Sequence, residues 1–206
     1  MNAAELILEI RELKREACPP HRSIERLDGM LTEFVRSGAE GPRPDFTRAT
    51  RGLYTRLLLN SMKDDFQVVL VLWGPGSRSP IHDHSGTVGM VAAYTGVTRE
   101  TKYTEGATGP GGCVQLERGG TTVLRGGATT PILPSDGMRL HDMANETAGW
   151  SATVHVYLTP ILDFHIYEPS TSGYFRREPR ELWFDAENAW RGLTGPSPTA
   201  SGRAAR

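Results

Sequence analysis

The sequence predicts a mainly β fold, a small β-barrel or jelly roll, preceded by N-terminal α-helices. The first third of the chain shows apolar residues at helical spacing, whereas from Phe66 short β-branched runs alternate with glycine-rich turns. The chain holds 23 glycines and 14 prolines, which favour many turns and short strands. Many short strands at close spacing are typical of a closed barrel or a sandwich.

Composition argues against several classes of function. The 206 residues include 23 Lys and Arg against 24 Asp and Glu, so no global basic field indicates binding to nucleic acid or a membrane. Cys18 and Cys113 form neither a CxxC pair nor a disulfide framework. The N-terminus lacks an apolar signal sequence and no apolar run is long enough to span a bilayer, so we expect a cytoplasmic protein. The sequence leaves the oligomeric state open, with a monomer as the simplest case.

Helices are predicted ahead of the barrel. Residues 3–17 form an amphipathic helix that stops at a Cys-Pro-Pro sequence. A second helix is predicted from Ser23, as its N-cap, to about Arg36, and a third over residues 45–60. We assign residues 1–62 to a helical segment that packs on the barrel.

Strands are predicted over most of residues 63–170, which we assign to the barrel. Their expected positions are 66–73, 82–84, 88–94, 97–103, 113–116, 121–124, 128–133, 138–143 and 152–158. After Pro160 the periodicity weakens. Residues 171–194 are expected to form a C-terminal extension, with an amphipathic piece over 181–190 packing back on the barrel. Residues 195–206 have the composition of a disordered tail.

Two histidines give the first chemical signal. His82 and His84 are separated by one residue in a predicted strand, so their side chains project from the same face. Such an imidazole pair is a common beginning of a metal site. The alternative is a pair of surface histidines on an edge strand. His21 and His165 stand alone, which is more typical of structural or solvated histidines.

The histidine pair and His141 lie in segments that resemble the two motifs of the cupin superfamily. The first motif is represented by Gly76, His82, His84 and Gly96, and the second by Pro134, Gly137, His141 and Asn145. Gly89 stands where the first motif usually places a glutamate ligand, and Asp83 points away from its histidine neighbours. The ligand set is therefore three imidazoles, which suit iron, zinc, copper and nickel alike. Three histidines leave positions for a bidentate substrate and dioxygen, and a site without a carboxylate ligand favours a thiolate.

A second group of polar residues follows one later strand. Thr153, His155 and Tyr157 alternate along it and therefore share a face. If that face lines the barrel, the three side chains would pair with one another, since buried polar groups need partners. Trp73 is expected to pack near this row or in the core. The alternative places Val154 and its apolar neighbours inside and the polar row in solvent.

At the level of whole motifs, the sequence resembles the cysteine dioxygenases, thiol dioxygenases of the cupin superfamily. The matching residues are Tyr54-Thr55-Arg56, Trp73-Gly74-x-Gly76, 81–84, Leu140-His141, 154–157 and Pro160. The resemblance implies that the histidines at 82, 84 and 141 bind Fe(II). It further implies that Arg56 pairs with the substrate carboxylate, with Tyr54 beside it, and that Tyr157 lies near the iron. His155 and Thr153 would orient Tyr157, the threonine standing where the family has a serine.

Two positions place this chain within the family. Animal members have a cysteine that cross-links to the tyrosine, and the matching position here is Gly89, as in many bacterial members. The related 3-mercaptopropionate dioxygenases have glutamine in place of Arg56, and the planar guanidinium suits a carboxylate. Without the resemblance, Arg56 would be interpreted as a solvated arginine at a helix end.

The resemblance therefore implies oxidation of L-cysteine by O2 to cysteine sulfinate. The alternatives are oxidation of another small thiol, such as 3-mercaptopropionate or cysteamine, and a metal cupin that is not an oxygenase. The latter would be an isomerase, a hydrolase or a binding protein, for which three histidines holding zinc would serve.

Overall fold

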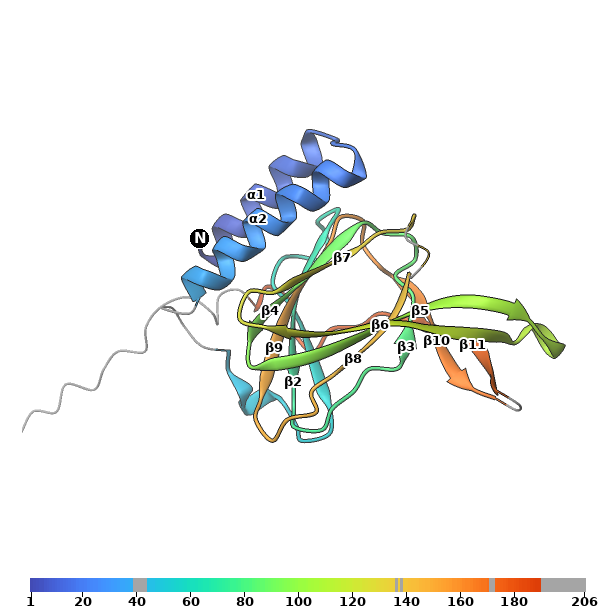
Figure 1. Ribbon diagram of the computed structural model, residues 1–206. Coiled ribbons are helices and arrows are strands. Elements are labelled where there is room, and N and C mark those ends of the chain that lie inside the picture. The colour runs from blue at the N-terminus through green and yellow to red at the C-terminus, as the bar shows by residue number, and fades with distance from the viewer. Residues whose placement is uncertain (39–43, 136, 138, 171–172, 190–206) are drawn as a thin grey trace, which may run out of the picture.

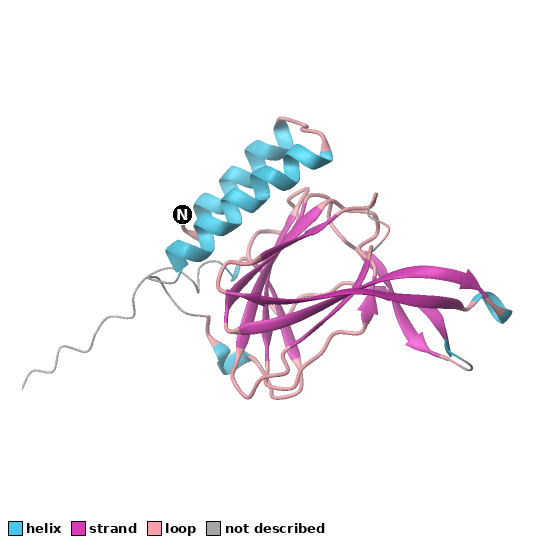
Figure 2. Cartoon of the chain, in the orientation of Figure 1, coloured by secondary structure: helices cyan, strands magenta, loops and turns pink. Residues whose placement is uncertain are grey.

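Two helices pack on one side of a barrel built from two β-sheets (Figures 1 and 2). The computed structural model describes residues 1–38, 44–135, 137, 139–170 and 173–189, and the predicted tail over 195–206 lies outside them. The prediction of a mainly β fold preceded by N-terminal helices is confirmed. Within the described part of the chain, no helix is long and apolar enough to cross a membrane.

The first two helices form as predicted, with a different start for the second. Helix α1 (Ala3–Arg15) is capped by Asn2, whose side chain accepts hydrogen bonds from two N–H groups of the first turn. Helix α2 (Pro20–Gly38) begins three residues before the predicted N-cap. Proline suits the first helical position because its φ is fixed and it has no N–H to satisfy. Ser23 therefore lies inside the first turn, where its hydroxyl donates to backbone carbonyls at a distance of 3.3 Å.

The third helix predicted over residues 45–60 is wrong. This stretch contains a 3-10 turn, η1 (Phe46–Arg48), and strand β1 (Tyr54–Leu58), which pairs antiparallel with β2 (Gln67–Trp73). Leu57 packs in the core beneath the helices, whereas Leu58 packs in the barrel interior. The apolar residues of this stretch end in three consecutive leucines at 57–59, a short run that periodicity cannot assign to a strand rather than a helix.

The remaining strands close the barrel. They are β3 (Ile81–His82), β4 (Gly89–Thr95), β5 (Val97–Thr108), β6 (Val114–Arg125), β7 (Thr129–Ile132), β8 (Leu140–Ala144), β9 (Ser151–Tyr157), β10 (Asp163–Pro169) and β11 (Tyr174–Glu181). A second 3-10 turn, η2 (Pro110–Gly112), follows β5. One sheet has the order β1-β2-β9-β4-β7, and the others form a closed ring in the order β10-β11-β6-β5-β8-β3.

Strands continue after Pro160, where the sequence shows only weak periodicity. Strands β10 and β11 form a hairpin that projects from the barrel beside the β5–β6 hairpin (Figure 1). Most of β11 is exposed or half-buried and charged, so the apolar alternation that marks a strand is weak. The division of the chain at residues 62 and 170 stays a prediction, and β1 and β11 pair with strands across those two positions.

Two separate cores explain why β2 and β9 are buried on both faces. Val68 and Leu70 pack with Val154 in the cluster that contains the helix residues. Val69 and Val71 belong to the cluster inside the barrel. Apolar residues of β9 thus contact the helices, and its polar row faces the barrel interior. The helices make this arrangement possible because they supply a second apolar layer for the outer face of the sheet.

Candidate metal centre

Three histidine side chains converge inside the barrel. His82 ends β3 and lies opposite His141 of β8 in the strand register. His84 lies in the turn after β3, beyond the strand predicted for it, where Ser85 and Gly86 adopt positive φ. One ring nitrogen of each histidine lies within 4.8 Å of the corresponding nitrogens of the other two. The structure therefore brings together the three predicted ligands.

The protonation of these rings fits a metal ion. The Nδ1 of His82 lies 2.9 Å from the Pro80 carbonyl oxygen, which can only accept, so we assign the hydrogen to Nδ1 and a free lone pair to Nε2. The Nε2 atoms of His84 and His141 lie 3.1 Å apart. Burial lowers the pKa of all three histidines, and places those of His84 and His141 well below 6.5. Neutral imidazoles whose lone pairs converge form a suitable donor set for a transition metal.

A buried glutamate that the sequence interpretation missed contacts one of the ligands. The Oε1 of Glu100, on β5, lies 2.7 Å from the Nδ1 of His141, and both side chains are almost completely buried. Burial raises the pKa of Glu100. A carboxylate in this position fixes the ring and increases the basicity of the ligating nitrogen. It also brings a negative charge close to the site, although no carboxylate joins the predicted ligand set itself.

The polar row of β9 is buried and hydrogen-bonded along its length. The Oγ1 of Thr153 lies 2.8 Å from the Nε2 of His155, and the Nδ1 of His155 lies 3.1 Å from the Tyr157 hydroxyl. The predicted mutual pairing is therefore present, and the solvent-exposed alternative is wrong. The structure adds one member, because Trp73 donates its Nε1–H to the Thr153 hydroxyl at 2.9 Å.

The added tryptophan sets the direction of the hydrogen bonds. Indole can only donate, so the Thr153 hydroxyl accepts from Trp73 and keeps its own proton available, which we assign to the Nε2 of His155. Burial lowers the pKa of His155 to about 3, so the ring is neutral. With Thr153 donating to Nε2, we assign the ring hydrogen to Nδ1. This hydrogen is donated to the Tyr157 oxygen. The phenolic O–H of Tyr157 is left free to donate into the cavity.

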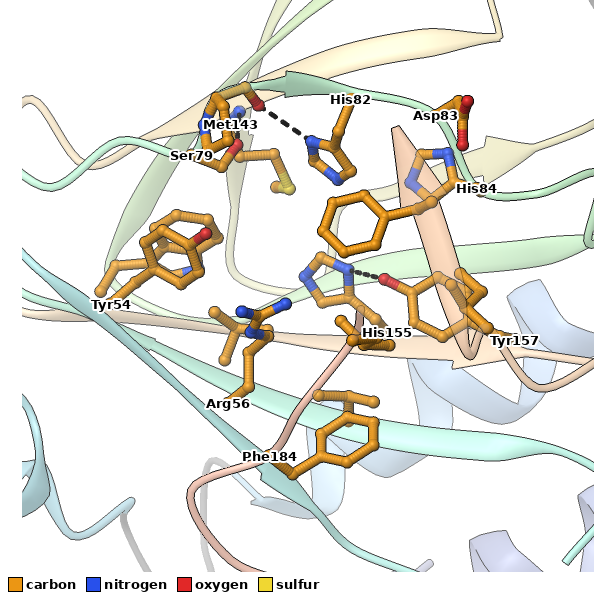
Figure 3. Close-up of a pocket in the computed structure, with 17 residues that line it drawn as sticks. Tyr54, Arg56, Ser79, His82, Asp83, His84, Met143, His155, Tyr157 and Phe184 are labelled. Carbon is orange, nitrogen blue, oxygen red and sulfur yellow. Dashed lines mark hydrogen bonds between the residues drawn. The ribbon is translucent and has the colours of Figure 1, made fainter. Parts of the chain in front are cut away.

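Arg56 and Tyr54 reach the same cavity from β1 (Figure 3). The cavity has a volume of about 50 Å³ and is also lined by His82, His84 and Tyr157. One water needs roughly 10–15 Å³ on this scale, so the space suits a small molecule. The helix-end interpretation of Arg56 is wrong, because residues 54 and 56 alternate on a strand and share its inner face.

The Arg56 guanidinium lies against aromatic rings. Its Cζ is 5.5 Å from the centre of the Tyr54 ring and 5.2 Å from that of Trp183. None of the described residues forms an ion pair with it. A cation in a small cavity whose described carboxylates do not pair with it favours an anionic ligand.

Asp83 and His165 pair with each other at the edge of the site. The Oδ2 of Asp83 lies 3.0 Å from the Nδ1 of His165, and the backbone of Asp83 also donates to the His165 carbonyl. Asp83 thus lies between two candidate ligands in sequence but contacts β10 instead. His21, in the first turn of α2, is exposed, and it is not among the histidines that converge in the barrel.

Gly89 lies opposite Tyr157 in the pairing of β4 with β9. A Cβ atom at residue 89 would lie 3.3 Å from Cδ1 of the Tyr157 ring and 2.3 Å from the Val156 carbonyl oxygen. A side chain here would therefore face the tyrosine but would require the backbone to shift. That this glycine replaces a cross-linking cysteine stays a prediction.

Comparison with known proteins gives one family and several structures of similar fold. The family described as cysteine dioxygenase type I matches residues 24–170, well over half of the chain. An uncharacterized conserved protein with a double-stranded β-helix domain from Klebsiella pneumoniae subsp. pneumoniae is 20% identical, with a TM-score of 0.42. The match covers 64% of this chain and 95% of that one.

Two further structures show a similar fold. A cupin-superfamily sugar phosphate isomerase from Silicibacter pomeroyi is 17% identical, with a TM-score of 0.41 and coverage of 66% of this chain and 93% of that one. An oxalate oxidase in complex with the substrate analogue glycolate is 19% identical, with a TM-score of 0.39 and coverage of 57% and 56%.

Proposed function

The chain belongs to the cysteine dioxygenase type I family, and from this premise we propose that it is an Fe(II)-dependent enzyme converting L-cysteine and O2 to cysteine sulfinate. Membership of this family, together with the three-histidine site, supports a metal-dependent oxidoreductase. In the proposed reaction the O–O bond breaks and two S–O bonds form. Sulfur loses four electrons, which O2 gains, and the thiol proton remains with the sulfinic acid.

The observation that most strongly supports a carboxylated thiol is the position of Arg56 in the cavity of His82 and His84, where it forms no ion pair with any described residue. Arginine binds carboxylates through two parallel hydrogen bonds. Cysteine carries a carboxylate, an amine and a thiol on two adjacent carbons. One end of such a molecule can contact Arg56 while its sulfur reaches the histidines.

We propose that His82, His84 and His141 hold the iron. Bound Fe(II) would supply the redox chemistry that allows dioxygen to react with a thiolate. The residues around it position the ring nitrogens, with the Pro80 carbonyl holding His82 and Glu100 holding His141. Imidazoles suit zinc as well as iron, so the preference for iron comes from the family.

Tyr157 would orient the ligand in the cavity. Burial raises its pKa, so the phenol stays protonated at neutral pH. His155 and Thr153 hold the hydroxyl, whose proton points into the cavity and is available to substrate or dioxygen. Tyr54 lies beside Arg56 and would help to bind the carboxylate.

The proposed function is tested by measuring sulfinate formed from cysteine by iron-loaded protein and by its Arg56→Gln variant. We expect kcat/KM for cysteine to fall about 10- to 100-fold, because the variant loses charged hydrogen bonds to the carboxylate. Turnover of 3-mercaptopropionate should fall much less, since glutamine occupies this position in enzymes acting on that thiol. Equal losses for both thiols would contradict the assignment of Arg56.

Two further measurements separate the alternatives. A panel of thiols under limiting O2 would reveal a preference for cysteamine or another thiol without a carboxylate, which would contradict the choice of cysteine. Metal content after purification without added metal, followed by O2 uptake after anaerobic Fe(II) loading, tests the class of enzyme. Absence of uptake with every thiol would leave a metal cupin that is not an oxygenase.

A further inference from the structure

The segment after β11 runs along the strand that carries Arg56. Residues 182–188, which we name the C-terminal strap, lie parallel to β1 at the edge of the five-stranded sheet. The Leu58 N–H donates to the Ala186 carbonyl at 2.9 Å, and the Leu182 N–H donates to the Leu162 carbonyl at 2.8 Å. The strap therefore satisfies part of a strand edge that would otherwise be open.

The strap is bonded to Arg56 itself. The Asp185 N–H donates to the Arg56 carbonyl at 2.8 Å, and the Arg56 N–H donates to the Asp185 carboxylate, also at 2.8 Å. Both backbone polar groups of residue 56 thus have partners in the strap. Any movement of the strap would shift the backbone from which the guanidinium extends.

Side chains of the strap line the end of the cavity at Arg56, which we name the carboxylate end because the substrate carboxylate would bind there. Leu182 and Phe184 line the cavity wall, and Phe184 lies beside Arg56 in Figure 3. Trp183, between them, places its ring 5.2 Å from the Arg56 Cζ, while the Tyr54 ring lies 5.5 Å from the same atom. Both distances are within the range of a cation–π contact.

The two aromatic rings differ in how they are supported. Tyr54 packs on the buried Trp73, with ring centres 5.0 Å apart. Trp183 is 60% exposed, and its position beside the guanidinium depends on where the strap lies. The family match ends at residue 170, so the strap lies outside the part of the chain that the match covers.

We propose that the C-terminal strap completes the carboxylate end of the substrate site, with Trp183 as a positioning residue for Arg56. This inference rests on the proposed function insofar as the ligand of Arg56 is a carboxylate. A free arginine side chain loses rotamer freedom when it binds. Two aromatic contacts restrict the guanidinium before the ligand arrives, so their effect is on binding of carboxylated thiols.

Steady-state kinetics of the iron-loaded enzyme test this role. Trp183→Leu should raise KM for cysteine about two- to fivefold, the range expected for one exposed cation–π contact, with kcat nearly unchanged. Its parameters for cysteamine, which has no carboxylate, should stay at the wild-type values. Trp183→Phe keeps a ring and should restore most of the affinity for cysteine. Trp150→Leu is the matched control, because Trp150 is also partly exposed but packs on Phe46.

An anaerobic binding measurement separates this inference from the proposed reaction. Tryptophan emission of the iron-loaded protein should change on adding cysteine. The change should persist in Trp150→Leu and be smaller in Trp183→Phe, in which Trp73 still lines the cavity. This signal without O2 uptake would overturn the proposed reaction and support the strap. Three results would overturn the inference. These are an equal rise in KM for cysteine and cysteamine in Trp183→Leu, an unchanged KM for cysteine in that variant, and an emission change that is the same in Trp183→Phe as in wild type.

Discussion

Two glutamates on β5, five residues apart, lie in opposite electrostatic surroundings. Glu100 lies in the barrel interior and accepts a hydrogen bond from His141, and burial raises its pKa. Glu105 lies in the projecting hairpin. Burial opposes its ionisation, but hydrogen bonds from Tyr167 and Arg177, with the nearby arginine charges, outweigh that effect and lower its pKa.

The two halves of β5 therefore serve different purposes: Glu100 supports the metal site, and Glu105 supports the stability of the fold. Glu100 contacts a candidate metal ligand, so its removal should be detected in metal binding. Glu105 joins β5 to Tyr167 of β10 and Arg177 of β11, and it also pairs with Arg139. Its removal should be detected in stability. Substitutions at the two glutamates test whether these tasks are independent.

The largest expected effect is on metal binding. Glu100→Ala should weaken metal affinity about 10- to 100-fold, because the Nδ1–H of His141 loses the carboxylate that orients the ring. Glu100→Gln keeps an acceptor oxygen and should lose less. Competition between the protein and a chelator for Fe(II) measures both. Glu105→Gln is the control, and a loss of affinity there equal to that of Glu100→Ala would contradict the separation of tasks.

A smaller effect is expected on folding. Glu105→Gln should lower the free energy of unfolding at pH 7 by about 1 kcal/mol, since it weakens several partly exposed charged hydrogen bonds. The midpoint of urea unfolding should decrease with an unchanged slope. Glu117→Gln, at an exposed residue of the neighbouring strand β6, provides the control. Equal destabilisation by the two substitutions would show that the Glu105 contacts add no stability.

The smallest expected effect is a pH dependence of the difference in free energy of unfolding between wild type and Glu105→Gln. The pKa of Glu105 is lower in the folded than in the unfolded protein, so its contribution is present above the unfolded pKa of about 4.3. It is lost as the pH falls through the folded pKa. The stability difference between wild type and Glu105→Gln should therefore be constant near neutrality and shrink below about pH 4.3. Urea midpoints measured from pH 7 downwards test this, and a difference that grows on acidification would refute it.

The predictable part of the site depended on short-range spacing. The spacing of one residue identified His82 and His84, whereas His141 was identified by its resemblance to the second cupin motif; all three converge in the barrel. Alternation along β9 identified the polar row, because residues two apart share a face in any strand. The alternation along β9 holds whatever the surrounding fold.

The parts that were missed depend on tertiary neighbours. Glu100 is one charged residue in a strand, a pattern typical of a solvent-facing position, and only the pairing of β5 with β8 places it near His141. Trp73 was expected near the polar row or in the core, but its hydrogen bond to Thr153 was missed, since it follows from the pairing of β2 with β9. Strand β1 was missed because its apolar residues include three consecutive leucines at 57–59, a short run that periodicity cannot assign to a strand rather than a helix.

Burial of β2 on both faces also bears on the order in which the chain is made. Its sequence, QVVLVLW, has no charge and no proline, features typical of segments that aggregate when exposed. Helices α1 and α2 precede it and leave the ribosome first. Their apolar faces are therefore available as soon as β2 emerges, well before its second strand partner, β9, is synthesised. In this protein the N-terminal helices can shield the most aggregation-prone strand during translation.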